Sequence, residues 1–185
     1  AAAIACAKQG KKVFLAEAGG CFGGTSTQAL VPELMNFDDG ENFLSGGVGR
    51  TVHDRLFRDT PRNRQWYVVK YETIKRLYDE LVAEAGVEFL FYSKVVDVIT
   101  DNSGRVKYAV LSGKSGIYAV SAKIFIDCTG DGSLCAYAGA DFEYGGENGA
   151  VAGATLCSVW GDIDFSKKNF IFDGCRYQEA YEKGY

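Results

Sequence analysis

The stretch that decides the fold is AAAIACAKQGKKVFLAEAGGCFGG, residues 1–24. Residues 1–9 are mostly small, a composition that favours a helix packed closely against a sheet, and Gly10 suits the position just after a helix end. Residues 13–16, VFLA, predict a short apolar strand that ends at Glu17. Helix, turn, strand and acidic residue in this order are the second half of a βαβ unit, whose first strand would precede Ala1.

An acidic residue at a strand end, followed by glycines, indicates a dinucleotide site. In such units a carboxylate at the end of the second strand accepts hydrogen bonds from a ribose diol, and Glu17 has that place. The loop over 18–24, AGGCFGG, follows directly. Its glycines permit backbone conformations closed to other residues and can bring N–H groups near an anion. For Glu17 taken alone, a solvated glutamate at a strand end is the alternative interpretation.

Periodicity and turn signals predict further helices and strands beyond the glycine loop. In chain order they are a helix over 48–57, a helix over 71–85, strands over 87–91, 94–100, 105–112, 117–121 and 123–127, and a short helix over 133–138. Tight turns join the three strands between 94 and 121, so we expect an antiparallel meander appended to a parallel sheet.

The strand over 123–127 runs directly into the turn CTGDG, residues 128–132. A tight turn in that position lets the backbone pass close to a ligand at the carboxyl ends of the strands, where doubly wound sheets bind cofactors. Thr129 and Asp131 are also candidate N-cap residues of the helix that follows. The two roles are compatible, because a helix N-terminus can lie near a pyrophosphate.

Taken in order, these segments resemble FAD-dependent oxidoreductases of the glutathione-reductase-like class. The resemblance covers about residues 1–146 and rests on the alanine-rich helix, the strand ending in Glu17, the meander, and three quoted stretches. These are CFGGTST at 21–27, EAGVEFLFYSKVVDV at 84–98 and IFIDCTGDGSLCAYAGADFEYG at 124–145. The family's GxGxxG fingerprint would lie just before Ala1.

The resemblance implies FAD as the cofactor and assigns roles position by position. Glu17 would bind the adenosine ribose, and Val95 would contact adenine through its backbone. The residues along the diphosphate or the flavin would be Gly23, Gly24 and Thr25. Those that approach the pyrophosphate and the ribityl chain would be Thr129, Gly130 and Asp131.

The expected fold class is α/β: a doubly wound parallel sheet of the FAD/NAD(P)-binding Rossmann-like type, with a three-stranded β-meander and its first strand missing. Residues 1–146 would form the FAD-binding domain, with an insertion at about 25–70. Residues 147–185 would begin a substrate-binding domain, with a strand over 154–160.

The implied function is hydride transfer between the flavin and a small organic substrate, with no catalytic acid or base assigned. An NAD-binding dehydrogenase domain and a non-catalytic flavin-binding module are the alternatives. Without the first strand, an apolar edge would be exposed. We therefore expect the 185 residues alone to be inactive, prone to aggregation and poor in FAD.

Composition and charge limit the classes of partner that the chain is expected to bind. The net charge of −4 comes from 24 acidic and 20 basic residues without a basic face, so nucleic acid is not expected. No apolar run reaches the roughly 18 residues of a membrane span, and no secretory signal is recognisable, which favours the cytoplasm. The expected partner is a small-molecule substrate, and the oligomeric state is open.

The histidine and the cysteines are interpreted as structural residues without a catalytic or metal-binding role. His53 is the only histidine and adjoins Asp54 and Arg55, so we expect it at the surface, and without a CxxC pair we expect no metal site. The cysteines are interpreted as small buried residues in a reducing compartment, with a redox role for Cys21 as the alternative. They are Cys6, Cys21, Cys128, Cys135, Cys157 and Cys175.

Overall fold

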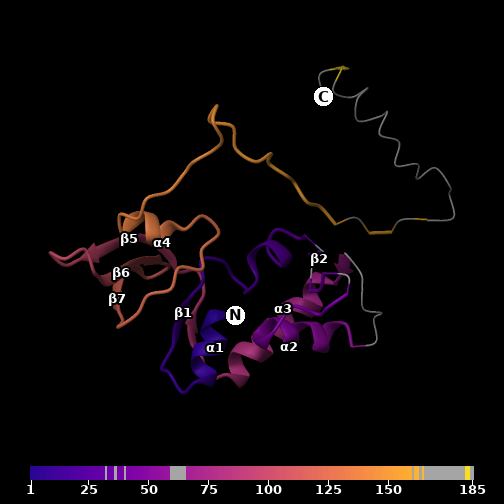
Figure 1. The fold of residues 1–185 in the computed structure, drawn as a ribbon, viewed down its shortest axis with the longest axis horizontal. Coiled ribbons are helices and arrows are strands. Elements are labelled where there is room, and N and C mark those ends of the chain that lie inside the picture. Colours follow the sequence, from indigo (N-terminus) through magenta and orange to yellow (C-terminus); the bar gives the residue numbers. More distant parts are fainter. Residues whose placement is uncertain are drawn as a thin grey trace.

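The fold is known from a computed structural model (Figure 1). It describes residues 1–31, 33–35, 37–39, 41–58, 66–159, 161–162, 164 and 182–183. Trp160, Cys175 and parts of the expected insertion lie outside these ranges. Helices α1, α2 and α3 lie together on one side of the molecule, and a small sheet with α4 lies on the other (Figure 1). Among the described helices, none is long and apolar enough to cross a membrane.

The first elements form the predicted half of a βαβ unit. Helix α1 (Ala2–Lys8) ends before Gly10, whose φ of +73° is the left-handed conformation that glycine adopts freely. Strand β1 (Phe14–Ala16) then pairs in parallel with β4 (Glu88–Leu90), in register Phe14 to Glu88. Among the described residues this pair is the whole of the parallel sheet. The doubly wound sheet is therefore not confirmed beyond these two strands.

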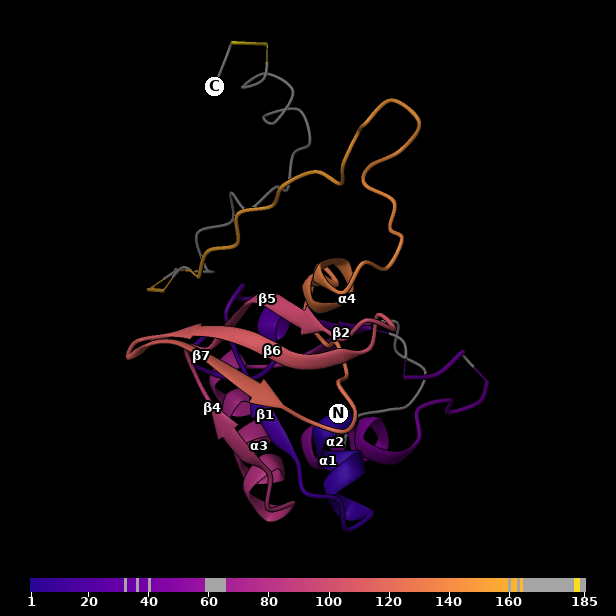
Figure 2. The same cartoon turned by 90° about the vertical axis from the view of Figure 1, so that its left-hand side faces the viewer.

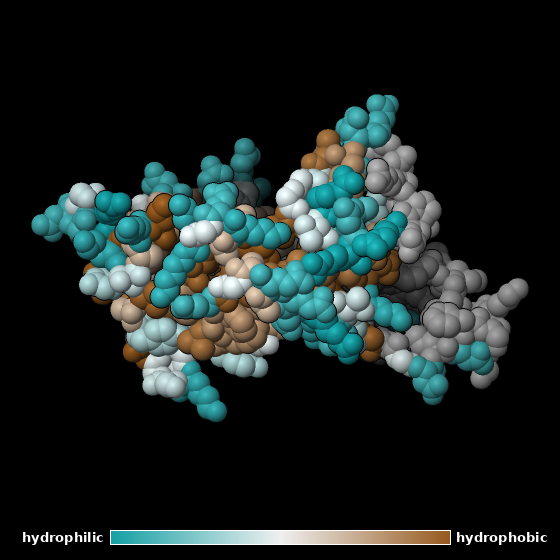
Figure 3. Space-filling view, turned by 90° about the horizontal axis from the view of Figure 1, so that it is seen from below, coloured by the Kyte–Doolittle hydropathy of each residue, from teal (hydrophilic) through white to brown (hydrophobic). Residues whose placement is uncertain are grey.

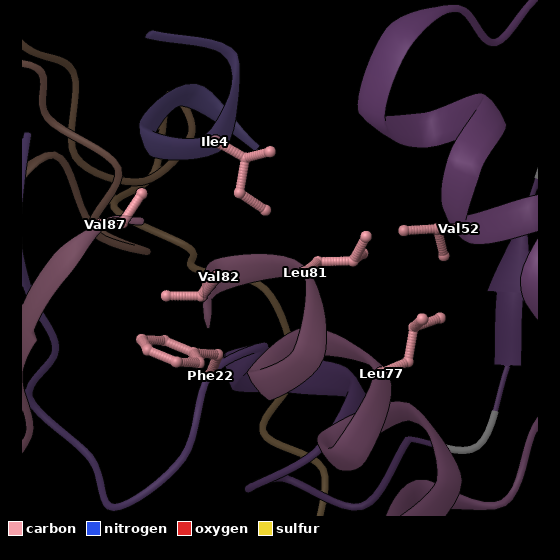
Figure 4. Packing of buried hydrophobic residues seen from close by; sticks show 7 residues of the cluster. All are labelled: Ile4, Phe22, Val52, Leu77, Leu81, Val82 and Val87. Carbon is pink, nitrogen blue, oxygen red and sulfur yellow. The ribbon is translucent and has the colours of Figure 1, made fainter. Parts of the chain in front are cut away.

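The core lies around α3 (Tyr71–Glu84), which supplies side chains to two buried clusters. Ile74, Leu77 and Leu81 recur three and four residues apart, which places them on one face. Figure 4 shows the first cluster between α1, α3 and α2 (Gly47–Leu56). Its buried members are Ile4, Phe22, Val52, Leu77, Leu81, Val82 and Val87. Each large aliphatic side chain buried there contributes about 1.5–3 kcal/mol.

The second cluster is mostly aromatic and belongs to the segment between the glycine loop and α3. It is bounded by the antiparallel pair of β2 (Glu33–Met35) and β3 (Trp66–Val68). Its buried members are Phe37, Phe57, Tyr67, Val69 and Ile74. The expected insertion therefore packs on the same helix as α1 and the glycine loop.

The three strands expected between 94 and 121 are present and form one antiparallel sheet. They are β5 (Lys94–Thr100), β6 (Val106–Gly113) and β7 (Gly116–Ser121), in spatial order β5-β6-β7. Figure 2 shows this sheet between α4 (Ser133–Tyr137) and the β1–β4 pair. Helix α4 packs against β5.

Two predicted strands are wrong. Residues 123–127 pair with no described strand, and Ile124 and Ile126 are 77% and 55% exposed rather than buried. Residues 154–159 are likewise not a strand, and Leu156 is 96% exposed. A strand needs a neighbour that satisfies its N–H and C=O groups, and neither segment has one among the described residues.

Beyond α4 the chain leaves the main body as an extended segment, seen in orange in Figures 1 and 2. Seen from below the helices, hydrophobic side chains reach the surface in several places among hydrophilic ones (Figure 3). The boundary expected near residue 147 falls within the extended segment, and a second domain stays a prediction.

Candidate functional site

Glu17 lies where the sequence places it, directly after β1 at the carboxyl end of the parallel pair. Its N–H donates to the carbonyl of Leu90 at 3.0 Å, and its carbonyl accepts the N–H of Ser93 at 2.9 Å. The backbone at Glu17 is therefore held on the adjoining strand by two hydrogen bonds. This fixes the position from which the carboxylate extends.

The carboxylate of Glu17 is half-buried and uses one oxygen for the protein itself. Oε1 accepts the N–H of Gly19 at 2.8 Å and the side-chain amide of Gln28 at 3.4 Å. The same amide donates to the carbonyl of Cys21 at 2.9 Å. Oε2 has no hydrogen-bond partner among the described residues, so it can accept a hydroxyl from a ligand. Gln28 is a member of this site that the sequence did not reveal.

Three glycines of the loop lie close to side chains of the protein itself. A Cβ added to Gly19 would collide with the amide of Gln28, and one added to Gly20 would collide with the hydroxyl of Tyr92. Gly23 has a φ of +110°, and a Cβ there would lie 2.6 Å from the ring of Tyr78. Ligand approach alone, the reason inferred from sequence, does not explain these three glycines.

The turn over 24–27 is exposed at its start and buried at its end. Gly24 has a φ of +54° and no atom within 4 Å of a Cβ position, so its backbone is accessible. Thr25, in the single 3₁₀ turn η1 (Gly24–Ser26), is exposed. Thr27 is fully buried and donates from Oγ1 to the carbonyl of Phe22 at 2.7 Å. Sequence reasoning assigned Gly24 and Thr25 to the site and missed the anchor at Thr27.

Val95 is the second residue of β5, an edge strand of the meander, and its side chain is buried. It lies opposite Leu111 of β6. Strand β5 begins one residue after Ser93, whose N–H reaches Glu17. Val95 therefore follows closely after Ser93, the residue whose backbone is hydrogen-bonded to Glu17. A backbone contact between Val95 and adenine stays a prediction.

The turn over 127–132 is held by a residue that the sequence analysis left out. One carboxylate oxygen of Asp127 accepts the N–H of Thr129 at 2.8 Å, and the other accepts the N–H of Cys135 in α4 at 2.9 Å. The hydroxyl of Thr129 accepts the N–H of Ser133 at 2.8 Å. The N-cap position of α4 is occupied by Gly132, so Thr129 supports the first turn of the helix from outside the predicted N-cap position.

Asp131 does not cap it, because it makes no hydrogen bond among the described residues, and Gly130 is open to solvent.

These hydrogen bonds set the ionisation of Asp127. Partial burial raises the pKa of its carboxyl, but the N–H groups of Cys135 and Thr129 outweigh this effect and hold the pKa below its ordinary value. Partial desolvation of the thiol, and then the same carboxylate, raise the pKa of Cys135. Asp127 is therefore ionised at neutral pH. Its hydrogen bonds connect the turn to α4.

Strand β5 connects the two halves of the site. Its first residues follow the segment bonded to Glu17, and α4, which begins after Thr129–Asp131, packs against the same strand. Glu17 is therefore hydrogen-bonded to the residue before β5, and the turn precedes a helix that packs on β5. A cavity of about 470 Å³ lies between Arg105, Lys123 and α4.

The prediction of a surface position for His53 is wrong. Its side chain is 3% exposed and lies among the rings of four aromatic residues. These are Phe37, Phe43, Phe57 and Tyr67. Nδ1 lies 3.1 Å from Oδ1 of Asp54, and Nε2 is buried without a hydrogen-bond partner in the described part of the chain.

The cysteines also differ from expectation. The five described ones are free thiols, and none of them is buried: Cys128 and Cys135 are exposed, and the others are intermediate. The part of the chain that the structure describes contains no group of three or more potential metal-ligating side chains.

Comparisons with known proteins identify the family of the chain. A family model described as "FAD dependent oxidoreductase" matches residues 1–185. No curated protein matches the chain.

Two solved structures share the fold. The crystal structure of THI4 from Thermovibrio ammonificans matches with a TM-score of 0.54 and 19% identity, over 74% of this chain and 55% of that one. A geranylgeranyl bacteriochlorophyll reductase-like protein from Thermoplasma acidophilum matches with a TM-score of 0.52 and 20% identity, over 75% and 38%. The chain thus spans about half of the first structure and less of the second.

Proposed function

The chain belongs to the family of FAD-dependent oxidoreductases, and from this premise we propose that it holds FAD between Glu17 and the turn at Thr129–Asp131. The enzyme would transfer a hydride between the flavin and a small organic substrate. When bound, FAD supplies the redox chemistry, and the protein supplies position and electrostatics. The observation that carries the proposal is the half-buried Glu17 carboxylate, which has one oxygen tied to the chain and one left for a ligand.

The residues present fit the adenosine end of FAD. A ribose hydroxyl donating to a carboxylate is a charge-assisted hydrogen bond, the stronger kind, and Oε2 of Glu17 is available for it within the described structure. The open backbone at Gly24 and Gly130 gives a ligand room to approach. Under the proposal, Gly23 and Thr25 flank the diphosphate or the flavin, and Val95 presents its backbone to adenine.

Unpaired strand edges and exposed apolar residues indicate where further structure would pack. The exposed Ile124 and Ile126 and the second edge of β1 have no partner among the described residues. A further strand paired with the free edge of β1, followed by a glycine-rich turn, would supply the main phosphate site. Residues from 147 onward would begin the substrate-binding part, and we place the enzyme in the cytoplasm.

The first experiment is the absorption spectrum of the complete protein that contains these residues. Flavin bands near about 375 and 450 nm are expected from the cofactor's chemistry, together with bleaching on addition of a reducing substrate. A colourless protein that binds NAD instead would contradict the proposal. Bound flavin that no candidate donor reduces would favour a non-catalytic module.

The second experiment places the adenosine end. Glu17→Gln removes the charge from the ribose acceptor, and the FAD dissociation constant should rise about tenfold or more, since a hydrogen bond to a charged group contributes about 1.5–3 kcal/mol. Glu88→Gln is the matched control, because Glu88 is an exposed glutamate at the opposite end of the same strand pair. Equal affinities for FAD in the two variants would contradict the assignment of Glu17.

A further inference from the structure

Tyr92 lies at the same end of the parallel pair as Glu17. It follows β4, and its N–H donates to the carbonyl of Gly19 at 3.0 Å. The next residue, Ser93, donates its N–H to the carbonyl of Glu17 at 2.9 Å. The backbone of 92–93 is therefore hydrogen-bonded to the loop that carries the proposed ribose acceptor, which brings Tyr92 beside the adenosine end of the site.

The conformation of Tyr92 is unusual for its residue type. Its φ is +52°, in the left-handed region that bulky side chains rarely occupy. Such strain persists only where the surroundings enforce it, and it gathers at functional sites. The two backbone hydrogen bonds enforce it here. Their effect is to direct an aromatic side chain across the glycine loop, so that its hydroxyl lies where a Cβ of Gly20 would be.

The ring of Tyr92 is also largely uncovered. Its side chain is 68% exposed, and within the described structure it makes no aromatic contact. The neighbouring rings of Phe89 and Phe91, by contrast, pack on Phe22 at centroid distances of 5.1 and 4.7 Å. Tyr92 is thus an aromatic side chain that the loop geometry holds in solvent instead of in the core.

We propose that the ring of Tyr92 is the stacking surface for the adenine of FAD. This inference rests on the proposed function, because it takes the ribose to be bound at Glu17. Adenine is bonded directly to the ribose, so it must lie close to the carboxylate that binds the ribose hydroxyls. Of Tyr92 and Ser93, whose backbone N–H groups donate to the Glu17 loop, Tyr92 has an exposed aromatic ring. Bases commonly stack on such rings in proteins.

The test compares FAD with FMN, which lacks adenosine, on the complete protein. Tyr92→Gly removes the ring and relieves the positive φ, so the fold should be as stable or more stable. FAD affinity should nevertheless fall about tenfold, the scale of one base stacked on an aromatic ring, while FMN affinity stays unchanged. Tyr92→Phe keeps the ring and should bind FAD within about twofold of the wild type.

Thermal melting of each variant checks that the fold is retained. Wild-type FAD affinity in Tyr92→Gly would overturn the stacking role and leave the proposed function standing. Equal losses of FAD and FMN would overturn it as well, because they would place Tyr92 near the flavin or in the fold itself. A wild-type protein that binds no flavin would overturn both proposals.

Discussion

At the scale of single residues, two acids of the turn differ in their contacts. Asp127 has both oxygens occupied by backbone N–H groups of the turn and of α4. Asp131, four residues later, is exposed and makes no hydrogen bond among the described residues. Sequence reasoning selected Asp131 because the family resemblance pointed to it. It passed over Asp127 because the partner at Cys135 is eight residues away.

We predict that Asp127→Asn lowers the free energy of unfolding by about 1 kcal/mol near neutral pH, the usual effect of losing a capping carboxylate. Asp131→Asn should change it by less than about 0.5 kcal/mol. Chemical denaturation of both variants measures this. Equal destabilisation by the two substitutions would contradict the division of roles.

The difference between wild type and Asp127→Asn should also depend on pH. Hydrogen bonding holds the folded-state pKa of Asp127 below its unfolded value of 3.8. The contribution of the carboxylate is therefore fully present above the unfolded value and is lost as the pH falls through the folded pKa. Denaturation curves for the two proteins should converge at low pH, and a gap that stays constant would argue against this cause.

His53 shows how neighbours in the chain can mislead. Asp54 and Arg55 beside it suggested the surface, yet the aromatic rings that cover it come mostly from other segments. One local signal was available, since Phe57 lies four residues on, on the same helix face. The burial of His53 thus depends on tertiary packing that its immediate neighbours do not reveal.

For His53 we predict that replacement by phenylalanine is close to neutral, within about 1 kcal/mol, because removal of the unpartnered buried Nε2 offsets the lost contact between Nδ1 and the Asp54 carboxylate. His53→Ala should cost about 3 kcal/mol, on the scale of other large core truncations. Urea unfolding distinguishes them. A loss in His53→Phe as large as that in His53→Ala would show that the ring nitrogens are needed.

At the scale of elements, predictions succeeded where the signal was local. The helix α3 carries its own apolar periodicity, and the meander carries its turn residues, so both appear at nearly the predicted bounds. The strands predicted over 123–127 and 154–160 depended on partners elsewhere. Apolar composition alone cannot show whether such a partner is present.

Hydrogen exchange tests the absence of strand pairing at 123–127. The amides of Ile124 and Ile126 should exchange freely, because these residues pair with no described strand. Val110, in the central strand β6, is paired on both sides and is the internal control, which should be protected. Protected amides at 124 and 126 would show that the segment is paired after all.

At the scale of the whole molecule, motifs in the sequence predicted where Glu17 and the turn after 127 lie along the chain, but not how they are connected. Glu17 bonds to Ser93, the residue before β5, and the turn precedes α4, which packs on β5. The hydrogen bonds of Gln28 and Asp127 were missed, because they join residues that no motif relates. How Glu17 and the turn lie relative to each other depends on long-range packing, which local patterns do not encode.

The same unpaired edges determine how the isolated chain should behave. With an exposed edge on β1 and apolar side chains at 124 and 126, we expect the 185 residues alone to aggregate and to retain little FAD. Light scattering and flavin absorbance measure this, with the complete protein as the control. A monomeric sample that melts cooperatively with bound flavin would prove the expectation wrong.

The most direct test of the central claim is a crystal structure of the complete protein grown with FAD. We predict an oxygen of Glu17 within hydrogen-bonding distance of an adenosine ribose hydroxyl, and the backbone of Thr129–Asp131 alongside the pyrophosphate or the ribityl chain of the same molecule. FAD bound on a surface that touches only one of these two places, or neither, would contradict the account.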